Sequence, residues 1–220
     1  MTGYSTVIFD LDGTLLDTIE LIVESHRHAL TTVLGRHEPD EVLRAGIGVP
    51  LHEQMRLFDE ERAEELFDAY RAFNRARHDE FACEYDGVLD VVAELRAAGV
   101  PIGIATSKML DAVELAYRLV PRLRGLVDAT VGLESTATHK PGPEPILHAL
   151  ELLGRPIEGA CYVGDAPTDL AAAHAAGVAA IAVTWGAFPR ELLVAAAPHA
   201  IAATPAELLA ILLPGVRTGA

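Results

Sequence analysis

The sequence has two cysteines, no long apolar run and no excess of positive charge. Cys83 and Cys161 do not make a disulfide framework, and Cys161 lies in the apolar run 160–163, where we expect a small buried side chain. No apolar stretch approaches the roughly 18 to 20 residues that a membrane-spanning helix needs. The first residues show no basic segment leading an apolar stretch. We therefore expect no secretory signal and a soluble, cytoplasmic protein.

Basic residues are outnumbered, with 17 Lys and Arg against 32 Asp and Glu and a formal net charge of −15. This balance disfavours nucleic acids and anionic membranes as partners, because both require basic surface. Half of the residues are hydrophobic and the mean hydropathy is +0.25, so 220 residues can bury a sizeable core.

Short apolar runs that end in Gly, Asp, Thr or Ser alternate with amphipathic segments. The predicted strands are 6–10, 101–106, 129–132, 160–164, 178–184 and, more weakly, 200–202, and the predicted helices are 88–98, 109–119, 143–153 and 167–176. This alternation predicts an α/β fold, a Rossmann-like doubly wound parallel sheet with helices on both faces. Ligands of such sheets bind beyond the carboxyl ends of the strands, where Asp10, Thr106 and Asp165 are expected.

Between residues 16 and 86 the alternation stops. We find no strand pattern there, and the apolar residues of 19–33 and 66–73 follow the three-and-four spacing of helices. A loop at 46–50 interrupts these helices, and charged stretches such as 71–77 are interpreted as solvated helix faces. The simplest interpretation is an inserted α-helical cap. The predicted domains are a catalytic core (1–15 and 87–220) and a helical cap (16–86).

The first predicted strand delivers two carboxylates, Asp10 and Asp12, into a turn marked by Gly13. This arrangement suits attack on phosphorus. One carboxylate can be the nucleophile, the other can handle the proton of the leaving group, and a divalent cation can screen both. Asp and Gly are also ordinary turn residues after a strand. Whether this segment is catalytic or only a turn therefore depends on the other segments of the chain.

Two further segments offer groups that suit phosphate oxygens. Thr106 and Ser107 end a predicted strand, where a hydroxyl and free backbone N–H groups can cradle a phosphate. On this segment alone, a plain helix N-cap is the better interpretation of Thr106. Lys140 precedes the proline-rich turn 141–145, whose stiffness can place an ammonium group with little loss of entropy. Surface lysines beside such turns are also common.

A fourth segment places Asp165 at the end of a predicted strand and Asp169 one helical turn later. Hard oxygen ligands of this kind suit Mg²⁺, which takes one or two carboxylates from the protein and keeps several waters. The alternative role for Asp165 is the N-cap of the following helix. Taken together, a nucleophile pair, a hydroxyl, a lysine and an acidic metal site follow one another, and each leaves a predicted strand or an adjoining loop.

These four segments resemble the motifs of the haloacid dehalogenase superfamily, in its phosphatase branch. The run Asp-Leu-Asp-Gly-Thr at 10–14 is the most specific, the resemblance extends from residue 4 to about 210, and the insertion is similar to a C1-type cap. The resemblance implies that Asp10 attacks phosphorus and forms an aspartyl-phosphate. It also implies that Asp12 protonates the leaving group and then deprotonates the water that hydrolyses the intermediate.

The resemblance further implies that Mg²⁺ is held by a carboxylate oxygen of Asp10, the backbone carbonyl of Asp12 and the carboxylate of Asp165. Asp169 would support the metal directly, through water, or by holding Lys140. The groups implied to grip the phosphoryl oxygens are Thr106, the Ser107 N–H and Lys140.

Residues that differ from those of other branches of the superfamily exclude some of the possible activities. Dehalogenases lack an acidic residue at the position of Asp12, and mutases of the β-phosphoglucomutase type carry a cap histidine where this chain has Ile22. Phosphonatases use a cap lysine, and residues 16–86 contain none. The sequence is most similar to phosphoglycolate phosphatases and to PpaX-type pyrophosphatases.

We therefore expect a Mg²⁺-dependent phosphatase whose partner is a small phosphorylated metabolite, a phosphoglycolate-like monoester. The alternative is an inorganic pyrophosphatase, followed by a sugar phosphomutase and a non-catalytic phosphoacceptor. The sequence predicts neither the oligomeric state nor the roles of Lys108 and Arg44.

Overall fold

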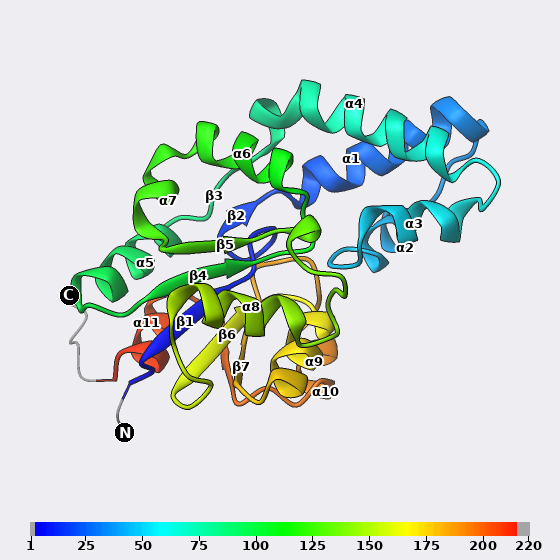
Figure 1. The fold of residues 1–220 in the computed structure, drawn as a ribbon. Coiled ribbons are helices and arrows are strands. Elements are labelled where there is room, and N and C mark those ends of the chain that lie inside the picture. The colour runs from blue at the N-terminus through cyan, green and yellow to red at the C-terminus, as the bar shows by residue number, and fades with distance from the viewer. Residues whose placement is uncertain (1–2, 215–220) are drawn as a thin grey trace.

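A computed structural model describes residues 3–214, in which helices lie on both faces of a six-stranded sheet and above one end of it (Figure 1). The strands of the sheet are β1 (Thr6–Phe9), β4 (Ile102–Ala105), β5 (Ala129–Val131), β6 (Ala160–Gly164), β7 (Ala179–Val183) and β8 (Ala200–Ala202). All neighbouring strands in it are parallel. The predicted strands and the predicted α/β fold are confirmed.

The strand order β5-β4-β1-β6-β7-β8 reverses next to the central strand β1. The chain moves outward from β1 through β4 to β5, returns to the other side of β1 at β6, and moves outward again. A parallel sheet wound in this way opens a crevice outside the carboxyl ends of the strands at the reversal. Asp10 follows β1 and Asp165 follows β6, so both carboxylates leave the sheet at that crevice.

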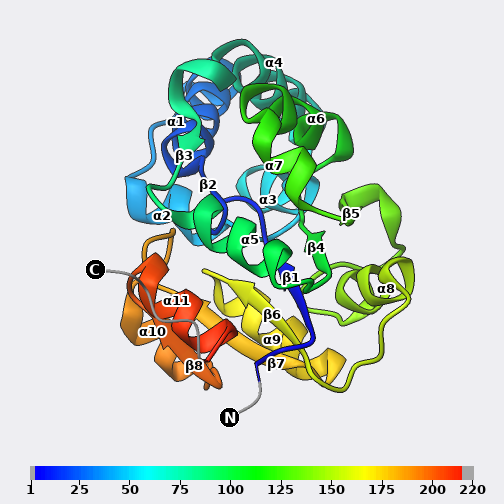
Figure 2. The same ribbon diagram turned by 90° about the vertical axis from the view of Figure 1, so that its left-hand side faces the viewer.

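Alternating side chains of each strand enter the two layers of helices. Val7 and Phe9 belong to one core cluster and Ile8 to the other. The helices on the first face are α5 (Val88–Ala97), α6 (Leu110–Leu119), α7 (Pro121–Leu126) and α11 (Pro205–Leu212). Those on the opposite face are α8 (Glu144–Leu153), α9 (Pro167–Ala176) and α10 (Arg190–Ala195) (Figure 2). The doubly wound arrangement explains why the strands read as almost continuous apolar runs.

The segment after β1 is helical, as its three-and-four spacing predicts. Its elements are α1 (Ile19–Ala29), a π-helical turn (Leu30–Leu34), α2 (Asp40–Ala45), α3 (Leu51–Phe58) and α4 (Ala63–Phe81). These helices lie beyond the carboxyl ends of the strands (Figure 1) and enclose a hydrophobic cluster of their own, which includes Leu43, Met55 and Leu66. We call them the cap helices. The domain boundaries at 15/16 and 86/87 stay a prediction.

The expectation that residues 16–86 contain no strand is wrong at both ends of the segment. β2 (Leu16–Asp17) pairs in antiparallel fashion with β3 (Cys83–Glu84), where the chain enters and leaves the cap helices. Strands of two residues are too short to show an alternating pattern, so the sequence carries no periodic signal for them. The ribbon brings the two connections side by side.

The structure also tests the predictions made from the cysteines and from the absence of a long apolar run. Cys161 is buried in the sheet, as predicted, and Cys83 is exposed. Between residues 3 and 214 there is no helix with both the length and the apolar character needed to cross a bilayer. The cytoplasmic location stays a prediction.

Candidate active site

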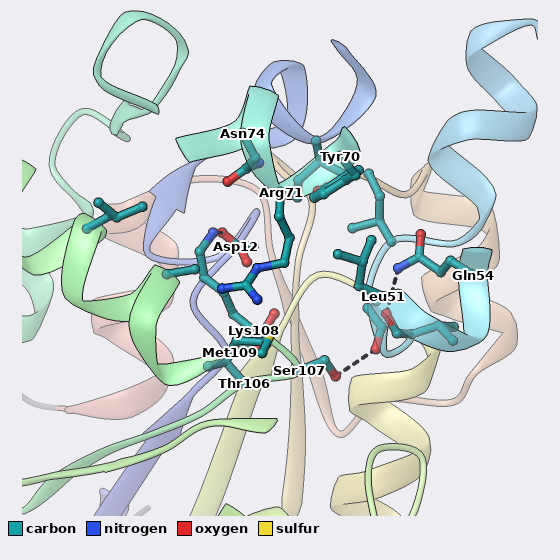
Figure 3. Close-up of a pocket in the computed structure, with 18 of the residues that line it drawn as sticks. Asp12, Leu51, Gln54, Tyr70, Arg71, Asn74, Thr106, Ser107, Lys108 and Met109 are labelled. Atoms are coloured by element: carbon teal, nitrogen blue, oxygen red, sulfur yellow. Dashed lines mark hydrogen bonds and ion pairs between the residues drawn. The ribbon is translucent and has the colours of Figure 1, made fainter. Parts of the chain in front are cut away.

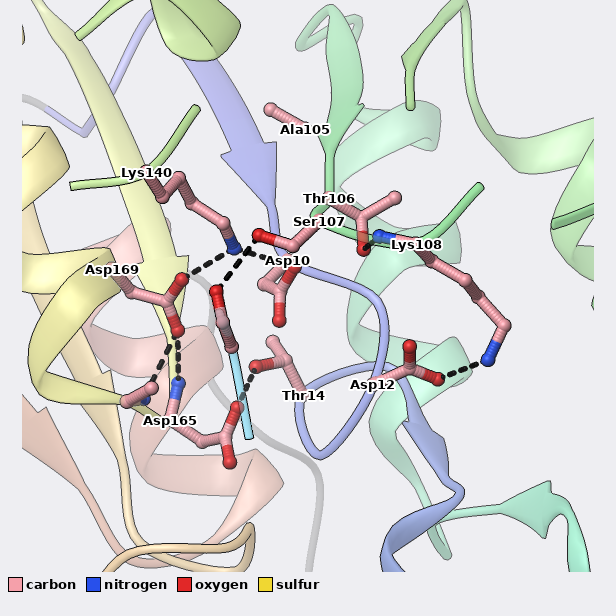
Figure 4. A network of polar contacts seen from close by, with 12 residues as sticks. Asp10, Asp12, Thr14, Ala105, Thr106, Ser107, Lys108, Lys140, Asp165 and Asp169 are labelled. Carbon is pink, nitrogen blue, oxygen red and sulfur yellow. Dashed lines mark hydrogen bonds and ion pairs between the residues drawn. The ribbon is translucent and has the colours of Figure 1, made fainter. Parts of the chain in front are cut away.

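The centre of the site is an ion-pair network around Lys140. Its Nζ atom donates to Oδ1 of Asp10 at 2.9 Å, to Oδ1 of Asp169 at 2.6 Å and to the hydroxyl of Tyr162 at 3.0 Å (Figure 4). The Tyr162 hydroxyl in turn donates to the carbonyl oxygen of Ala105 at 2.6 Å. Three acceptors satisfy the three donors of an ammonium group. Lys140 is buried, and these three hydrogen bonds hold its ammonium group in one position.

Asp169 uses both of its oxygens within this network. While Oδ1 accepts from Lys140, Oδ2 accepts the backbone N–H groups of Asp165 at 3.1 Å and of Ala166 at 3.0 Å. Backbone donors hold the carboxylate at the start of α9, and the carboxylate holds Lys140. This is one of the three roles that the sequence left open for Asp169.

Asp165 lies on the other side of the crevice and points back toward the turn after β1. Its Oδ1 atom accepts from the Thr14 hydroxyl at 3.1 Å, and Oδ2 accepts from the Ala187 N–H at 2.7 Å. The N-cap of α9 is Ala166, and the Asp165 side chain makes no capping hydrogen bond. The alternative of a helix cap is therefore wrong for Asp165, whose carboxylate faces the site.

The same correction applies to Thr106. Helix α6 begins three residues later than a cap at Thr106 would require, with Met109 as its N-cap. The Thr106 hydroxyl oxygen accepts the N–H of Lys108 at 3.2 Å, which leaves its proton available to another acceptor. The Ser107 hydroxyl donates to the carbonyl oxygen of Gly48 at 2.8 Å, so this side chain binds a loop between the cap helices.

Negative charge exceeds positive charge in the buried part of the site. One carboxylate oxygen from each of Asp10, Asp165 and Asp169 lies within 4.8 Å of the others, and Lys140 is the ammonium beside them. Burial raises the pKa of Asp10 to about 7 against the opposing effect of Lys140. Burial, together with the charges of Asp169 and Asp10, raises the pKa of Asp165 well above its usual value. A divalent cation would balance this excess.

Asp12 is held apart from that cluster by two donors. The Thr18 hydroxyl donates to Oδ1 of Asp12 at 2.6 Å. Lys108 Nζ donates to the same oxygen at 2.7 Å (Figure 4). Sequence reasoning assigned no role to either residue. A signal for Lys108 was present, because the chain has two lysines, Lys108 and Lys140, and both lie beside the predicted motifs.

A pocket opens between the predicted catalytic residues and the cap helices (Figure 3). Its lining includes Asp10, Asp12, Thr106 and Lys108 from the sheet side, and from the cap side Ile22, Ile47, Gly48, Val49, Leu51, Gln54, Tyr70, Arg71, Asn74 and Arg75. Arg71 extends from α4 toward Lys108. The stretch 71–77, interpreted from the sequence as a solvated helix face, is partly exposed as expected, but Arg71 and Arg75 also line the pocket. Arg44 is not among the lining residues.

The family model for haloacid dehalogenase-like hydrolases matches residues 7–183. The chain belongs to this family. A pyrophosphatase PpaX from Bacillus cereus is 38% identical over 208 residues, which cover 94% of this chain and 96% of that protein. A haloacid dehalogenase-like hydrolase from Streptococcus pneumoniae has a TM-score of 0.81 at 27% identity and covers 96% of this chain and 99% of its own. These likenesses make the chain a phosphatase of the family.

A candidate phosphoglycolate phosphatase from Lactobacillus plantarum has the same fold, with a TM-score of 0.85 at 23% identity. The match covers 96% of this chain and all of that one. The four predicted motifs of the hydrolase thus meet at the crevice of a fold that its relatives share. The roles of the individual residues remain proposals.

Gly13 of this haloacid dehalogenase-like hydrolase offers a test of the turn after β1. We expect Gly13→Ala to lower phosphatase activity by about 100-fold or more, because an added Cβ would overlap the Asp165 carboxylate and displace it. The backbone of Gly13 has φ +78°, so the left-handed conformation should cost about 1–2 kcal/mol as well.

Gly99 supplies the matched control, because it has φ +77° and nothing within 4 Å of an added Cβ. Gly99→Ala should lose similar stability and keep its activity. Activity and thermal unfolding of both variants would be compared. Equal activities in the two variants would show that the position of Asp165 does not depend on Gly13.

Proposed function

We propose that this phosphatase transfers the phosphoryl group of a small metabolite first to Asp10 and then to water. The observation that carries the proposal is the position of the Asp10 carboxylate. It lies at the carboxyl end of the central strand, with one oxygen held by Lys140 and with Asp12 and the pocket beside it. A fixed carboxylate next to a fixed ammonium suits attack on an anionic phosphorus centre.

In the first step an oxygen of Asp10 bonds to phosphorus while the bond to the leaving oxygen breaks, and Asp12 gives that oxygen a proton. In the second step Asp12 removes a proton from water, which attacks the same phosphorus and releases phosphate from Asp10. The pair of hydrogen bonds from Thr18 and Lys108 keeps Asp12 in place for both proton transfers.

The buried carboxylates fit a hard divalent cation such as Mg²⁺. Three carboxylates around one ammonium leave an uncompensated negative charge. Burial first, and the neighbouring carboxylates second, raise the pKa values of Asp10 and Asp165. Asp10, Asp165 and the backbone carbonyl of Asp12 would hold the ion, which when bound neutralises charge on the phosphoryl oxygens. Since both oxygens of Asp169 are engaged, we propose that this residue acts by holding Lys140.

The phosphoryl oxygens would be gripped by neutral donors and by Lys140. The Thr106 hydroxyl is free to donate, and the Ser107 N–H follows it at the end of β4. The Ser107 side chain is engaged by Gly48, so its backbone is the part that it can offer. Stabilising charge on the transferred group in this way accounts for most of the rate gain in phosphoryl transfer.

For the substrate we propose inorganic pyrophosphate first and a phosphoglycolate-like monoester second. The curated relatives named pyrophosphatase PpaX, at 38% identity, favour pyrophosphate. Ile22 lines the pocket at the position where β-phosphoglucomutases carry a histidine, and an apolar side chain cannot transfer a proton. This favours hydrolysis over a phosphomutase reaction.

The test is phosphate release from pyrophosphate, phosphoglycolate and a panel of sugar and nucleotide phosphates, with Mg²⁺ and with EDTA. We expect the metal to be required, with EDTA lowering the rate by about 100-fold or more, because the buried carboxylates would otherwise repel the substrate. Release from no compound, with folded protein and Mg²⁺ present, would contradict the proposal. A long-lived aspartyl-phosphate without turnover would instead identify a phosphoacceptor.

A further inference from the structure

The pocket beside Asp10 and Asp12 contains a second group of cations, separate from Lys140. Arg71 and Arg75 reach it from α4 and Lys108 reaches it from the loop after β4. Figure 3 shows the guanidinium of Arg71 over the part of the pocket where Lys108 and Asp12 lie. Four carboxylates, Asp10, Asp12, Asp111 and Asp165, line the same pocket. The three cations are therefore the lining groups that could attract an anionic part of a ligand.

Asp111, at the start of α6, holds the two arginines in place. Arg71 and Arg75 are four residues apart and thus lie on one side of α4, and both pair with Oδ2 of Asp111, Arg75 at 2.5 Å. A guanidinium has five N–H donors, and a shared carboxylate oxygen uses few of them. The side chains are still 33% and 57% exposed, so both can contact a ligand.

The arginines belong to α4 of the cap helices, whereas the groups that would bind the transferred phosphoryl follow strands of the sheet or, for Lys140, precede α8. Lys140 is buried beside Asp10, whereas Arg71 extends from α4 toward Lys108 and Asp12 (Figure 3). A substrate that placed its phosphorus at Asp10 would therefore direct its leaving group toward α4. Guanidinium groups bind carboxylates and phosphates through paired hydrogen bonds, which a neutral leaving group cannot form.

We propose that Arg71, assisted by Arg75, forms a subsite for a second anionic group of the substrate. The inference rests on the proposed function and specifies its substrate class: compact compounds with a phosphoryl group and, on the leaving group, a phosphate or a carboxylate. Pyrophosphate and phosphoglycolate share this chemistry. Asp111 is a positioning residue that orients the two arginines and offsets their mutual repulsion.

The rival explanation is a mechanical one, because the same ion pairs join α4 to α6 across the pocket. A latch of this kind would change the rate with every substrate to the same extent. A subsite would change it only for substrates with a charged leaving group. The two explanations are therefore separated by comparing substrates rather than by the loss of activity itself.

The experiment measures kcat and KM of Arg71→Gln with pyrophosphate, phosphoglycolate and p-nitrophenyl phosphate, whose leaving group is uncharged in the ground state. We expect kcat/KM to fall by about 10- to 100-fold for the two doubly anionic substrates, mostly through KM. For p-nitrophenyl phosphate the change should stay below about threefold, since no charged group reaches Arg71. A fall confined to pyrophosphate or to phosphoglycolate would identify which anion the subsite binds.

Arg77→Gln is the matched control, since Arg77 lies on the same helix, pairs with Glu80 at 2.6 Å and is not among the pocket residues. It should leave all three substrates unchanged. An equal fall of kcat/KM on all three substrates in Arg71→Gln would overturn the subsite in favour of the latch. The wild-type enzyme tests the proposed function separately, because that function fails only if wild-type protein releases no phosphate.

Discussion

Replacing Asp10 by Asn is expected to lower phosphate release by about 10⁴-fold or more while the protein stays folded. An amide oxygen is a poor nucleophile and cannot form the aspartyl-phosphate. The folded state should lose little stability, because Lys140 keeps Asp169 and the Tyr162 hydroxyl as partners. The neutral side chain also removes a charge from a buried position. Steady-state phosphate release and thermal unfolding would be measured on the same preparations.

Asp128→Asn serves as the control for this substitution. Asp128 pairs with Arg96 at 2.8 Å next to β5, away from the pocket residues, so activity should stay within about twofold of wild type. Acid-quenched wild-type enzyme should contain a phosphoryl group on the peptide with Asp10, detectable by mass spectrometry. Activity retained in Asp10→Asn would show that another group attacks phosphorus.

Replacing Lys140 by Met is expected to lower both stability and activity. The ammonium is buried between Asp10 and Asp169, and removing one partner of a buried ion pair costs about 3–5 kcal/mol because the other charges remain in the interior. Phosphate release should fall by about 10³-fold, since Lys140 would stabilise charge on the phosphoryl oxygens. Urea unfolding without added metal gives the stability change.

The other lysine of the chain provides the comparison. Lys108→Met removes an ion pair to Asp12, but Thr18 still donates to the same oxygen, so less stability should be lost. In a double variant, Asp169→Asn should recover part of the stability lost in Lys140→Met, because it removes one unpaired charge. The recovery should not extend to activity. If the single variant Lys140→Met were as stable as the wild-type protein, the carboxylates of Asp10 and Asp169 would have to be neutral when the ammonium is absent.

Most of the sheet was predictable because each strand is marked locally. The runs that became β1 and β6 are apolar on both faces, as strands covered by helices on both sides are, and each ends at an Asp or Gly. The predicted edges of these strands therefore lie within a residue or two of the observed ones. The pair β2 and β3 was not predicted, because a strand of two residues is too short to show an alternation of apolar and polar side chains.

The lining of the pocket was predicted where its residues follow strands and was not predicted where they come from the cap helices. Asp10, Thr106 and Asp165 could be assigned because parallel strands end at the same edge of a sheet. Arg71 and Arg75 could not, because a charged stretch of a helix has the same sequence pattern whether it faces solvent or a pocket. Arg44, the cation nearest in sequence to the loop at 46–50, is not among the residues that line the pocket.

The sequence by itself determined which carboxylates and which lysine stand at strand ends, since apolar runs and turn residues act over a few positions. Only the tertiary structure decided what each group faces. It joins Lys140 to Asp169, Lys108 to Asp12 and, across the pocket, Arg71 to Asp111. These partners are between 29 and 96 residues apart. Their meeting depends on the strand order and on the way the cap helices fold over the sheet, which no local pattern records.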